Sequence, residues 1–479
     1  MSPPVRHPPA RAAAALPTGE GLHTRRIALD ILLEVEYRGG YADALLGAKI
    51  ASLDPADRRL VTRLVLGTLA WRGRLDYELE QMTGRKLAQI QPEALEIMRM
   101  GLLQLRFLDR MPQHAVVSTT VELAKRSAGT KVAAGFINAI MRRATREKIA
   151  MPAREPDLAR YLATSYSHPR WLVERFIEWF GAEDAERLMA ADNEAAPNVI
   201  RLNLARGSRA EIIERLSADG FQMGSGGHAL ETIVLASAAR FESDAYRAGL
   251  FVPQSEASQL VARMLAPRTG AVIIDLAAAP GGKSTHLAEL AGKGARIIAL
   301  DRNHAGLKNA RELGARLRHS NIEFVRADAA TALPFPARSA DFILLDAPCT
   351  GLGTLREHPE IRWRMQPSDP ARMALVQSAM LANAAEILRP GGAIVYSVCS
   401  LAPEEGEGVV RDFLAAHREF EIDRAPAVRT EAPDLFDDAG FMRTRPDHGG
   451  LDGFFAARLV RKSARGDMSG TLQRTPPTR

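Results

Sequence analysis

The stretch AVIIDLAAAPGGKSTHLAELAGKGARIIALD, residues 271–301, decides the fold of the C-terminal part of this chain. An apolar β-branched run ends at Asp275, a turn with two glycines follows, and apolar residues at helical spacing lead to a second such run ending at Asp301. Strands that are apolar on both faces and alternate with helices are typical of a doubly wound parallel sheet. We therefore predict an α/β domain around this stretch.

The same alternation continues toward the C-terminus. Further strands are predicted at 322–328, 340–346 and 391–398, and helices at 304–318, 370–388 and 404–417. Two last strand candidates, 440–446 and 450–461, predict an antiparallel hairpin at the edge of the sheet.

The N-terminal part has a different pattern. Apolar residues recur at intervals of three and four, which predicts helices at 23–37, 57–82, 92–108, 114–128 and 135–148. A break with two prolines follows at 151–161. Between this break and the α/β domain we predict a small α+β subdomain, with strands at 198–205, 230–236 and 249–254 and helices at 208–220 and 255–267.

Charge is unevenly distributed along the chain. The 479 residues carry a net charge of +6, and 46% of them are apolar. Residues 22–150 hold 21 Lys and Arg against 14 Asp and Glu, whereas residues 151–460 carry a net negative charge. A basic helical region favours a phosphate-rich partner such as a nucleic acid, and an ordinary solvated surface is the alternative.

Composition also narrows the cellular compartment in which this protein is expected. No apolar run approaches the roughly 20 residues that span a bilayer, so we expect no membrane association. Cysteine occurs only twice, without the spacing of a disulfide framework, which favours a reducing, cytoplasmic compartment. Residues 1–21 and the basic residues 463–479 are expected to be disordered tails, with a transit peptide as the alternative at the N-terminus.

The turn DLAAAPGGKS (275–284) predicts a ligand site, because small residues allow a ligand to approach the backbone at a helix N-terminus. It is neither a dinucleotide fingerprint nor a P-loop, and a tight structural turn is the alternative. Three neighbouring strands end in an acid that can accept hydrogen bonds from a ribose. Together these features favour S-adenosylmethionine as cofactor. The predicted cofactor-binding residues are Ala277, Ala278, Ala279, Pro280, Gly281, Gly282, Lys283, Asp301, Asp328 and Asp346.

Both cysteines directly follow predicted strands. Cys349 lies in DAPCTGLGT (346–354), and Cys399 lies in YSVCS (396–400). Ligands of open α/β sheets bind at the carboxyl ends of the strands. Two thiols at that edge therefore predict a role in chemistry.

These motifs carry a family resemblance. DLAAAPGGKS, DAPCTGLGTLREHPEIRW (346–363) and YSVCSLAPEEGE (396–407) resemble the Sun family of RNA cytosine-5 methyltransferases. The helical region is similar to the NusB-type RNA-binding domain of the bacterial branch that methylates small-subunit (16S) rRNA. The resemblance covers residues 22–462. It implies a NusB-like RNA-binding domain at 22–150, linker helices and an α+β RNA-binding subdomain at 151–265, and a Rossmann-like methyltransferase domain at 266–462.

The resemblance also implies roles for single residues. Cys399 would attack C6 of the cytosine and Cys349 would assist release of the product. Asp346 would lie beside the base, and Lys283 would lower the pKa of the thiol or orient the base; a surface helix lysine is the alternative. Arg356, Arg362 and Arg364 are expected to contact the RNA backbone, while Trp363 could stack on a base or merely pack. No metal is expected.

Two positions depart from the family pattern: Ala277 stands where the family commonly has Cys, and Val398 where it commonly has Thr. Neither change removes a residue with an expected catalytic role. We therefore expect an active enzyme that methylates 16S rRNA before the subunit is fully assembled, as a monomer with no obligate protein partner. Cytosine-5 methylation of another RNA such as tRNA, another methyl acceptor such as a protein, and a non-catalytic ribosome assembly factor are the alternatives.

Overall fold

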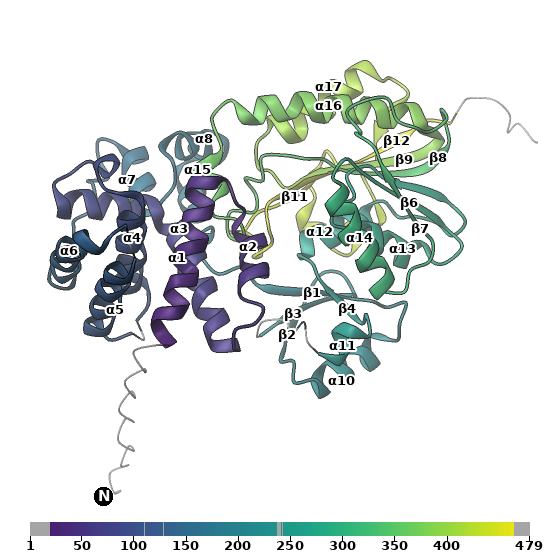
Figure 1. Cartoon of the computed structure of the whole chain (residues 1–479). Coiled ribbons are helices and arrows are strands. Elements are labelled where there is room, and N and C mark those ends of the chain that lie inside the picture. Colours follow the sequence, from purple (N-terminus) through teal and green to yellow (C-terminus); the bar gives the residue numbers. More distant parts are fainter. Residues whose placement is uncertain (1–19, 110, 128, 237–240, 242, 464–479) are drawn as a thin grey trace, which may run out of the picture. The chain divides into compact units, whose positions relative to one another are not determined.

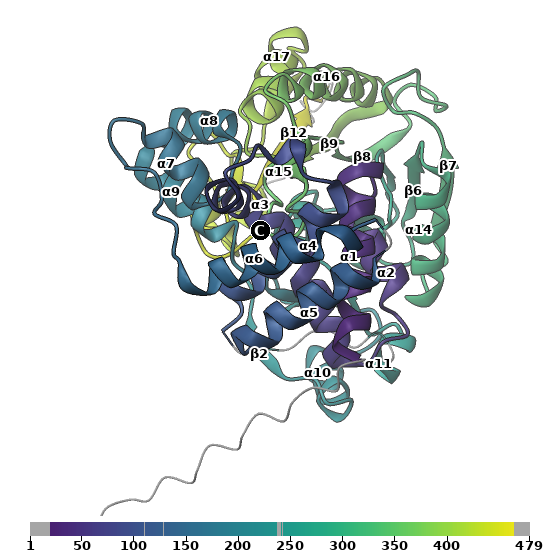
Figure 2. The same ribbon diagram turned by 60° about the vertical axis from the view of Figure 1, so that its left-hand side comes forward.

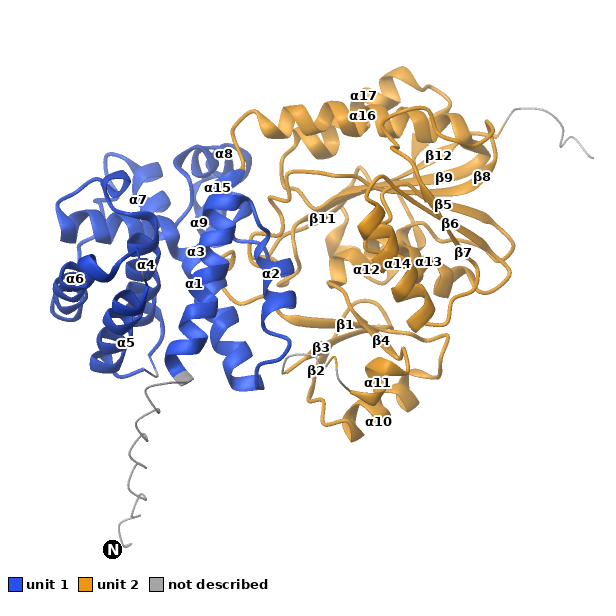
Figure 3. Ribbon diagram, in the orientation of Figure 1, with its two compact units in different colours: residues 1–189, 357–364 blue, residues 190–356, 365–479 orange. Residues whose placement is uncertain are grey.

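The computed structural model describes residues 20–109, 111–127, 129–236, 241 and 243–463. The chain divides into two compact units, Met1–Met189 with Glu357–Arg364 and Ala190–Arg356 with Met365–Arg479 (Figure 3). The first is helical, and the second contains both sheets. The predicted fold class of a helical bundle, a small α+β subdomain and a Rossmann-like α/β domain is confirmed. The two predicted tails fall almost wholly outside the described residues.

Every regular element described in the first unit is a helix. A helix start is well defined at α3, where the Asp54 side chain accepts hydrogen bonds from the backbone N–H groups of Ala56 and Asp57, and Pro55 occupies the first turn. Among the described residues, no helix is both long and apolar enough to cross a membrane. The elements are α1 (Glu20–Arg38), α2 (Ala42–Lys49), α3 (Pro55–Thr83), η1 (Leu87–Gln89), α4 (Pro92–Phe107), α5 (Gln113–Arg126), η2 (Lys131–Ala133), α6 (Ala134–Arg146), α7 (Leu158–Ser165), α8 (Arg170–Phe180), α9 (Ala182–Ala191) and α15 (Ile361–Arg364).

Helix α4 forms the centre of this unit and contacts α1, α3, α5 and α6 (Figure 2). Every residue from Ala94 to Gln104 is buried, so the helix is packed on all sides. Its buried charges are paired: Arg99 Nε lies 2.6 Å from Asp76 Oδ1, and Arg99 also bonds to Glu96. Burial raises the pKa of Glu96 to about 7.

The small subdomain is an antiparallel sheet in the order β2-β3-β1-β4 with two helices. Its helix α10 begins at a capping box, in which Ser208 and Glu211 exchange hydrogen bonds. The strands predicted around β1, β3 and β4 are present. β2 was missed because its sequence MGSG is exposed and pairs with a shifted register. The elements are β1 (Asn198–Leu202), α10 (Arg209–Ala218), β2 (Met223–Gly226), β3 (Thr232–Leu235), α11 (Asp244–Arg247) and β4 (Phe251–Pro253).

The large sheet has the order β10-β12-β9-β8-β5-β6-β7, with β11 paired to β12. The five strands from β9 to β7 are parallel, and β12 runs antiparallel to β9. β11 and β12 form the predicted antiparallel hairpin, but β12 lies between β9 and β10 and is not itself the edge strand. β6 and β7 lie on one side of β5, and β8 and β9 lie on the other, so the order of strand addition reverses between β5 and β8. Open α/β sheets bind ligands at such a switch point. The strands are β5 (Val272–Asp275), β6 (Arg296–Asp301), β7 (Ile322–Arg326), β8 (Ala340–Asp346), β9 (Leu388–Val398), β10 (Phe420–Ile422), β11 (Met442–Thr444) and β12 (Phe454–Arg461).

Helices cover both faces of this sheet (Figure 1). Ile274 and Ile343 pack toward α16 and α17, whereas their neighbours Ile273 and Leu344 pack toward α12 and α13. Burial on both faces explains why these strands are continuously apolar. The helices of this domain are α12 (Glu256–Met264), α13 (Gly282–Ala291), α14 (His304–Arg316), α16 (Asp369–Ile387) and α17 (Val409–Ala416). Its short helical turns are η3 (Glu404–Gly408), η4 (Ala427–Thr430) and η5 (Pro433–Leu435).

Candidate active site

The two cysteines leave the sheet at the ends of adjacent strands. β8 and β9 are parallel, and their register pairs Asp346 with Ser397. The turns that follow therefore start side by side at the carboxyl edge of the large sheet. They bring Cys349 Sγ to 3.2 Å from Cys399 Sγ, and both side chains are partly exposed.

The surroundings of the Cys349 thiol disfavour its ionised form. The hydrogen bond to Cys399, burial and the nearby Glu405 raise the pKa of the Cys349 thiol well above its usual range. Cys349 therefore keeps its proton at neutral pH. It can donate that proton toward Cys399 Sγ.

Lys283 and Asp346 form an ion pair at the same edge. Lys283 Nζ lies 2.6 Å from Asp346 Oδ2, and Ser397 Oγ donates to Asp346 Oδ1 at 2.7 Å. The Lys283 side chain is only 14% exposed, and its Nζ lies 5.4 Å from the ring centre of Phe454. The alternative that Lys283 is a surface lysine is therefore wrong.

The glycine turn connects β5 to α13 and is bonded to the end of β6. Ala279 N–H donates to Asp301 Oδ2 at 3.0 Å. Gly281 has a φ of +103°, and a Cβ at this position would lie 2.8 Å from Ala310 of α14. Only glycine fits there without strain, so the sequence signal marks a close approach of two backbones.

Three of the strand-end acids meet at this edge, with different partners. Asp301 and Asp328 each accept a hydrogen bond from the backbone two residues further on, and Asp346 pairs with Lys283. Asp275, at the end of β5, was not predicted as a site residue. It is buried, Ser284 Oγ donates to it at 2.6 Å, and burial raises its pKa to about 7.

Sequence reasoning also missed Arg201, on β1 of the small subdomain. Its side chain is fully buried and donates to Gly282 O at 2.7 Å and to Thr285 Oγ1 at 3.0 Å. It also pairs with Glu289 at 3.0 Å. The first turn of α13, which carries Lys283, is therefore held from the side of the small subdomain. No local pattern identifies Arg201, because its partners lie more than 50 residues away in the chain.

The expected RNA contacts after Cys349 are corrected by the structure. We call residues 346–356 the cysteine segment and residues 357–364 the docked segment; the docked segment belongs to the helical unit. Arg362 is fully buried and donates to the carbonyl groups of Ala70 and Ser167. Trp363 Nε1 donates to Leu69 O at 2.7 Å. The prediction that Arg362 contacts RNA is wrong, and Trp363 packs.

The two remaining arginines of this stretch also bond to carbonyl groups. Arg356 is buried in the second unit and donates to Gly450 O at 2.6 Å. Arg364 donates to Val35 O at 2.9 Å and to Gly40 O, inside the helical unit. Each bond uses one guanidinium nitrogen for the fold. Arg364 remains partly exposed, so the expected RNA contacts of these two arginines stay a prediction.

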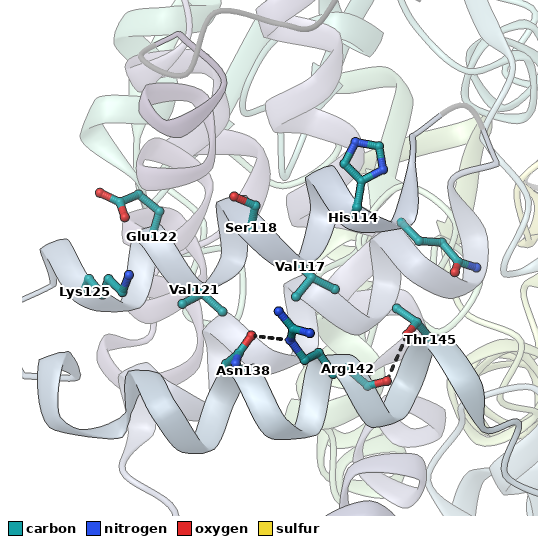
Figure 4. A pocket seen from close by; sticks show the side chains of 10 residues that line it. His114, Val117, Ser118, Val121, Glu122, Lys125, Asn138, Arg142 and Thr145 are labelled. Carbon is teal, nitrogen blue, oxygen red and sulfur yellow. Dashed lines mark hydrogen bonds between the residues drawn. The ribbon is translucent and has the colours of Figure 1, made fainter.

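A groove of about 510 Å³ lies in the helical unit between α5 and α6 (Figure 4). His114 and Lys125 line it from α5, and Arg142 and Asn138 from α6, with Arg142 Nε donating to Asn138 Oδ1 at 3.2 Å. Its one acid, Glu122, pairs with Arg126 at 2.8 Å. The groove contains none of the predicted site residues, and its charge suits an anionic partner.

Three family models match consecutive parts of this chain. The family described as 16S rRNA methyltransferase RsmB/F matches residues 262–460, and the NusB family matches residues 22–146. The ferredoxin-like domain of RsmF/B-like methyltransferases matches residues 168–242. Together these matches cover most of both units.

Whole-chain relatives agree with these matches. The chain is 36% identical over 445 residues to ribosomal RNA small subunit methyltransferase B of Thermus thermophilus, covering 91% of this chain and 97% of the relative. It is 32% identical over 426 residues to the protein of the same name from Pseudomonas putida, covering 88% and 94%.

Solved structures are similar over the same regions. The crystal structure of PH0851 has a TM-score of 0.79 at 26% identity and covers 93% of this chain and 99% of its own. NSun6 from Pyrococcus horikoshii with SFG has a TM-score of 0.55 at 25% identity, covering 62% and 99%. The chain therefore belongs to the RsmB/F family of S-adenosylmethionine-dependent methyltransferases of small-subunit ribosomal RNA.

Proposed function

We propose that this enzyme methylates C5 of a cytosine in 16S rRNA through a covalent bond between Cys399 and C6 of the base. The observation that carries the proposal is the 3.2 Å separation of the Cys349 and Cys399 sulfurs beside the Lys283–Asp346 pair. A methyltransferase that modifies an oxygen or an exocyclic nitrogen has no need of two adjacent thiols.

The chemistry of C5 explains the need for a thiol. This carbon is a weak nucleophile in the aromatic ring, and addition of a thiolate to C6 turns it into a reactive enamine carbon. S-adenosylmethionine supplies the methyl group as an electrophile. A base must then remove the C5 proton, so that the C5–C6 double bond re-forms and the C6–sulfur bond breaks.

The raised pKa of Cys349 is compatible with the roles that the family resemblance implies. By that resemblance Cys399 attacks C6, and Cys349, whose pKa is raised, keeps its proton. Cys349 Sγ then lies within hydrogen-bond distance of the departing Cys399 sulfur and can return a proton to it. Asp346, held by Lys283 and Ser397, hydrogen-bonds to the base.

The glycine turn fits the cofactor. Residues 277–282 carry no side chain larger than the proline ring, and they lead into the N-terminus of α13. The carboxylates of Asp301 and Asp328 lie at the same edge; Asp301 is partly exposed, and the Asp328 side chain is 42% exposed. These two acids and the backbone of the turn would hold its polar groups.

We assign RNA capture to the groove between α5 and α6. This groove lies in the basic N-terminal region, and Lys125 and Arg142 line it. A single strand of RNA binds through its phosphates to such cations, with affinity that falls as salt rises.

The two cysteine variants test the proposed reaction. Cys399→Ala should abolish methylation and form no covalent complex with RNA. Cys349→Ala should still attack and then release slowly, so a protein–RNA complex joined through Cys399 should appear as a slow band on a denaturing gel. Bisulfite mapping of 16S rRNA, from cells with and without the gene, identifies the cytosine.

Other outcomes of this experiment contradict the proposal in distinct ways. A covalent complex formed by Cys399→Ala would reverse the two roles. Wild-type methylation by both variants would show that the thiols only pack.

A further inference from the structure

Glu405 is a buried acid that the proposed reaction does not use. It lies in η3, a π-helical turn that leads into α17, and its exposed fraction is 0%. π-helical turns are rare and frequently occur at functional sites. A buried carboxyl group is costly unless it is well bonded, so its partners decide what it does.

Those partners are the residues that directly follow the two cysteines. Glu405 Oε2 accepts from Thr350 N–H at 2.9 Å, and Oε1 accepts from the Thr350 hydroxyl. The Ser400 hydroxyl donates to Oε1 at 2.6 Å and also lies 3.0 Å from the Thr350 hydroxyl. One carboxyl group thus binds the turn of Cys349 and the turn of Cys399 together.

A second layer holds Glu405 itself. Gln377 of α16 donates through Nε2 to Glu405 Oε2 at 3.0 Å and to Pro348 O at 3.0 Å. The hydroxyl of Tyr396, on β9, donates to the backbone carbonyl of Glu405. Gln377 and Tyr396 are fully buried, so neither can exchange these partners for water.

We propose that Glu405 is a positioning residue that sets the distance between Cys349 and Cys399. The proposal rests on the proposed function for its consequence in catalysis, but the distance itself is measurable without RNA. The four hydrogen bonds that the Glu405 carboxylate accepts come from the residues that follow the two cysteines and from Gln377. No other described residue bonds to both Thr350 and Ser400.

A trivalent arsenical measures the distance between the thiols. Phenylarsine oxide bonds to two neighbouring thiols: two As–S bonds form, and the arsenic-bound oxygen leaves with the two thiol protons as water. The chain has only two cysteines, so a single adduct that blocks both thiols identifies this pair. The rate is followed by intact mass and by protection from iodoacetamide, on the full-length protein.

Glu405→Met keeps the size of the side chain but removes its acceptors. We expect arsenical capture at least ten times slower and methylation reduced by about 100-fold, the effect of a displacement of about 1 Å. The half-saturating concentration of S-adenosylmethionine should be unchanged, because Glu405 does not touch the glycine turn.

Glu405→Gln separates position from charge. Its amide oxygen can accept from Thr350 N–H and Gln377, and its amide nitrogen can donate to the two hydroxyl oxygens. Capture should therefore proceed at the wild-type rate. The pH profile of Cys349 alkylation should shift to lower pH, because Glu405 contributes to the raised pKa of that thiol.

Two further variants complete the test. Glu407→Met is the matched control, since Glu407 pairs with Arg411 and Arg443 and not with either turn, and it should capture the arsenical normally. If Glu405→Met fails to fold, Thr350→Val with Ser400→Ala removes the hydroxyl bonds alone and should slow capture by a smaller factor.

Each result decides one question. Wild-type capture and methylation by Glu405→Met would overturn the positioning role, as would equal losses in Glu405→Met and Glu407→Met. Slow capture by Glu405→Met in a protein whose wild type forms no 5-methylcytosine would uphold the positioning role and reject the proposed function.

Discussion

The cysteine segment and the docked segment are consecutive in the chain but have different partners. In the cysteine segment, backbone and hydroxyl donors meet Glu405, and Gly353 N–H donates to Cys399 O at 3.0 Å. In the docked segment, guanidinium and indole donors meet carbonyl groups of the helical unit. The comparison teaches that arginines beside an active-site motif are nucleic-acid ligands only if their donors are not already used by the fold.

Gly353→Ala should have the largest effect. A Cβ on this residue would lie 1.9 Å from the carbonyl oxygen of Gly453, a rigid backbone atom, so the cysteine segment must move. Methylation should fall by about 100-fold or more, measured with 16S rRNA fragments and labelled cofactor.

Gly226→Ala in β2 is its matched control, since the nearest atom to the added Cβ lies 3.6 Å away. If Gly353→Ala and Gly226→Ala methylate equally well, the cysteine segment tolerates displacement. The close packing of this segment would then not matter for methylation.

Gly73→Ala tests the packing of the docked segment, and we expect a smaller effect. Gly73 lies in α3, and its added Cβ would lie 2.7 Å from Cη2 of Trp363. We expect the free energy of unfolding to fall by about 1–3 kcal/mol, as for other overpacked sites. The measurement is thermal unfolding followed by helical circular dichroism.

An open helical glycine provides the control for Gly73→Ala. Gly47, in α2, has nothing within 4 Å of an added Cβ. Gly47→Ala should therefore be neutral or stabilise by up to about 1 kcal/mol. Equal stability of the two variants would show that Trp363 does not pack against α3.

Arg362→Met should have the smallest effect on RNA binding. Its guanidinium donates to backbone carbonyls, so its removal should leave the dependence of RNA affinity on salt unchanged. In contrast, Lys125→Ala with Arg142→Ala should reduce the slope of log affinity against log salt by roughly 0.7–0.9 for each phosphate that the protein no longer neutralises. Filter binding over a range of salt concentrations measures both.

The contrary result would reinstate the sequence-based expectation. A shallower slope for Arg362→Met and an unchanged slope for the groove variant would place the RNA on the docked segment and not between α5 and α6.

The sequence by itself determined the fold class and the chemical character of the site. Apolar periodicity predicted the long helices and the five parallel strands, because each pattern repeats within one element and depends on burial alone. The strands β2 and β10 escaped it, since four exposed residues and three residues respectively carry too short a pattern. Strand ends marked Cys349, Cys399 and the acids, because parallel strands deliver their carboxyl ends to one edge.

Only the tertiary structure decided which groups meet. The 3.2 Å contact of the thiols depends on β8 and β9 being neighbours, which the order of strands along the chain does not specify. In the sequence EEGE nothing distinguishes Glu405 from the other acids, and only its hydrogen bonds do so. Arg362 lies in a basic stretch, but one of its acceptors, the carbonyl group of Ala70, is 292 residues earlier in the chain. Hydrogen-bond partners and burial arise from contacts across long separations, and a local pattern of residue types contains no record of them.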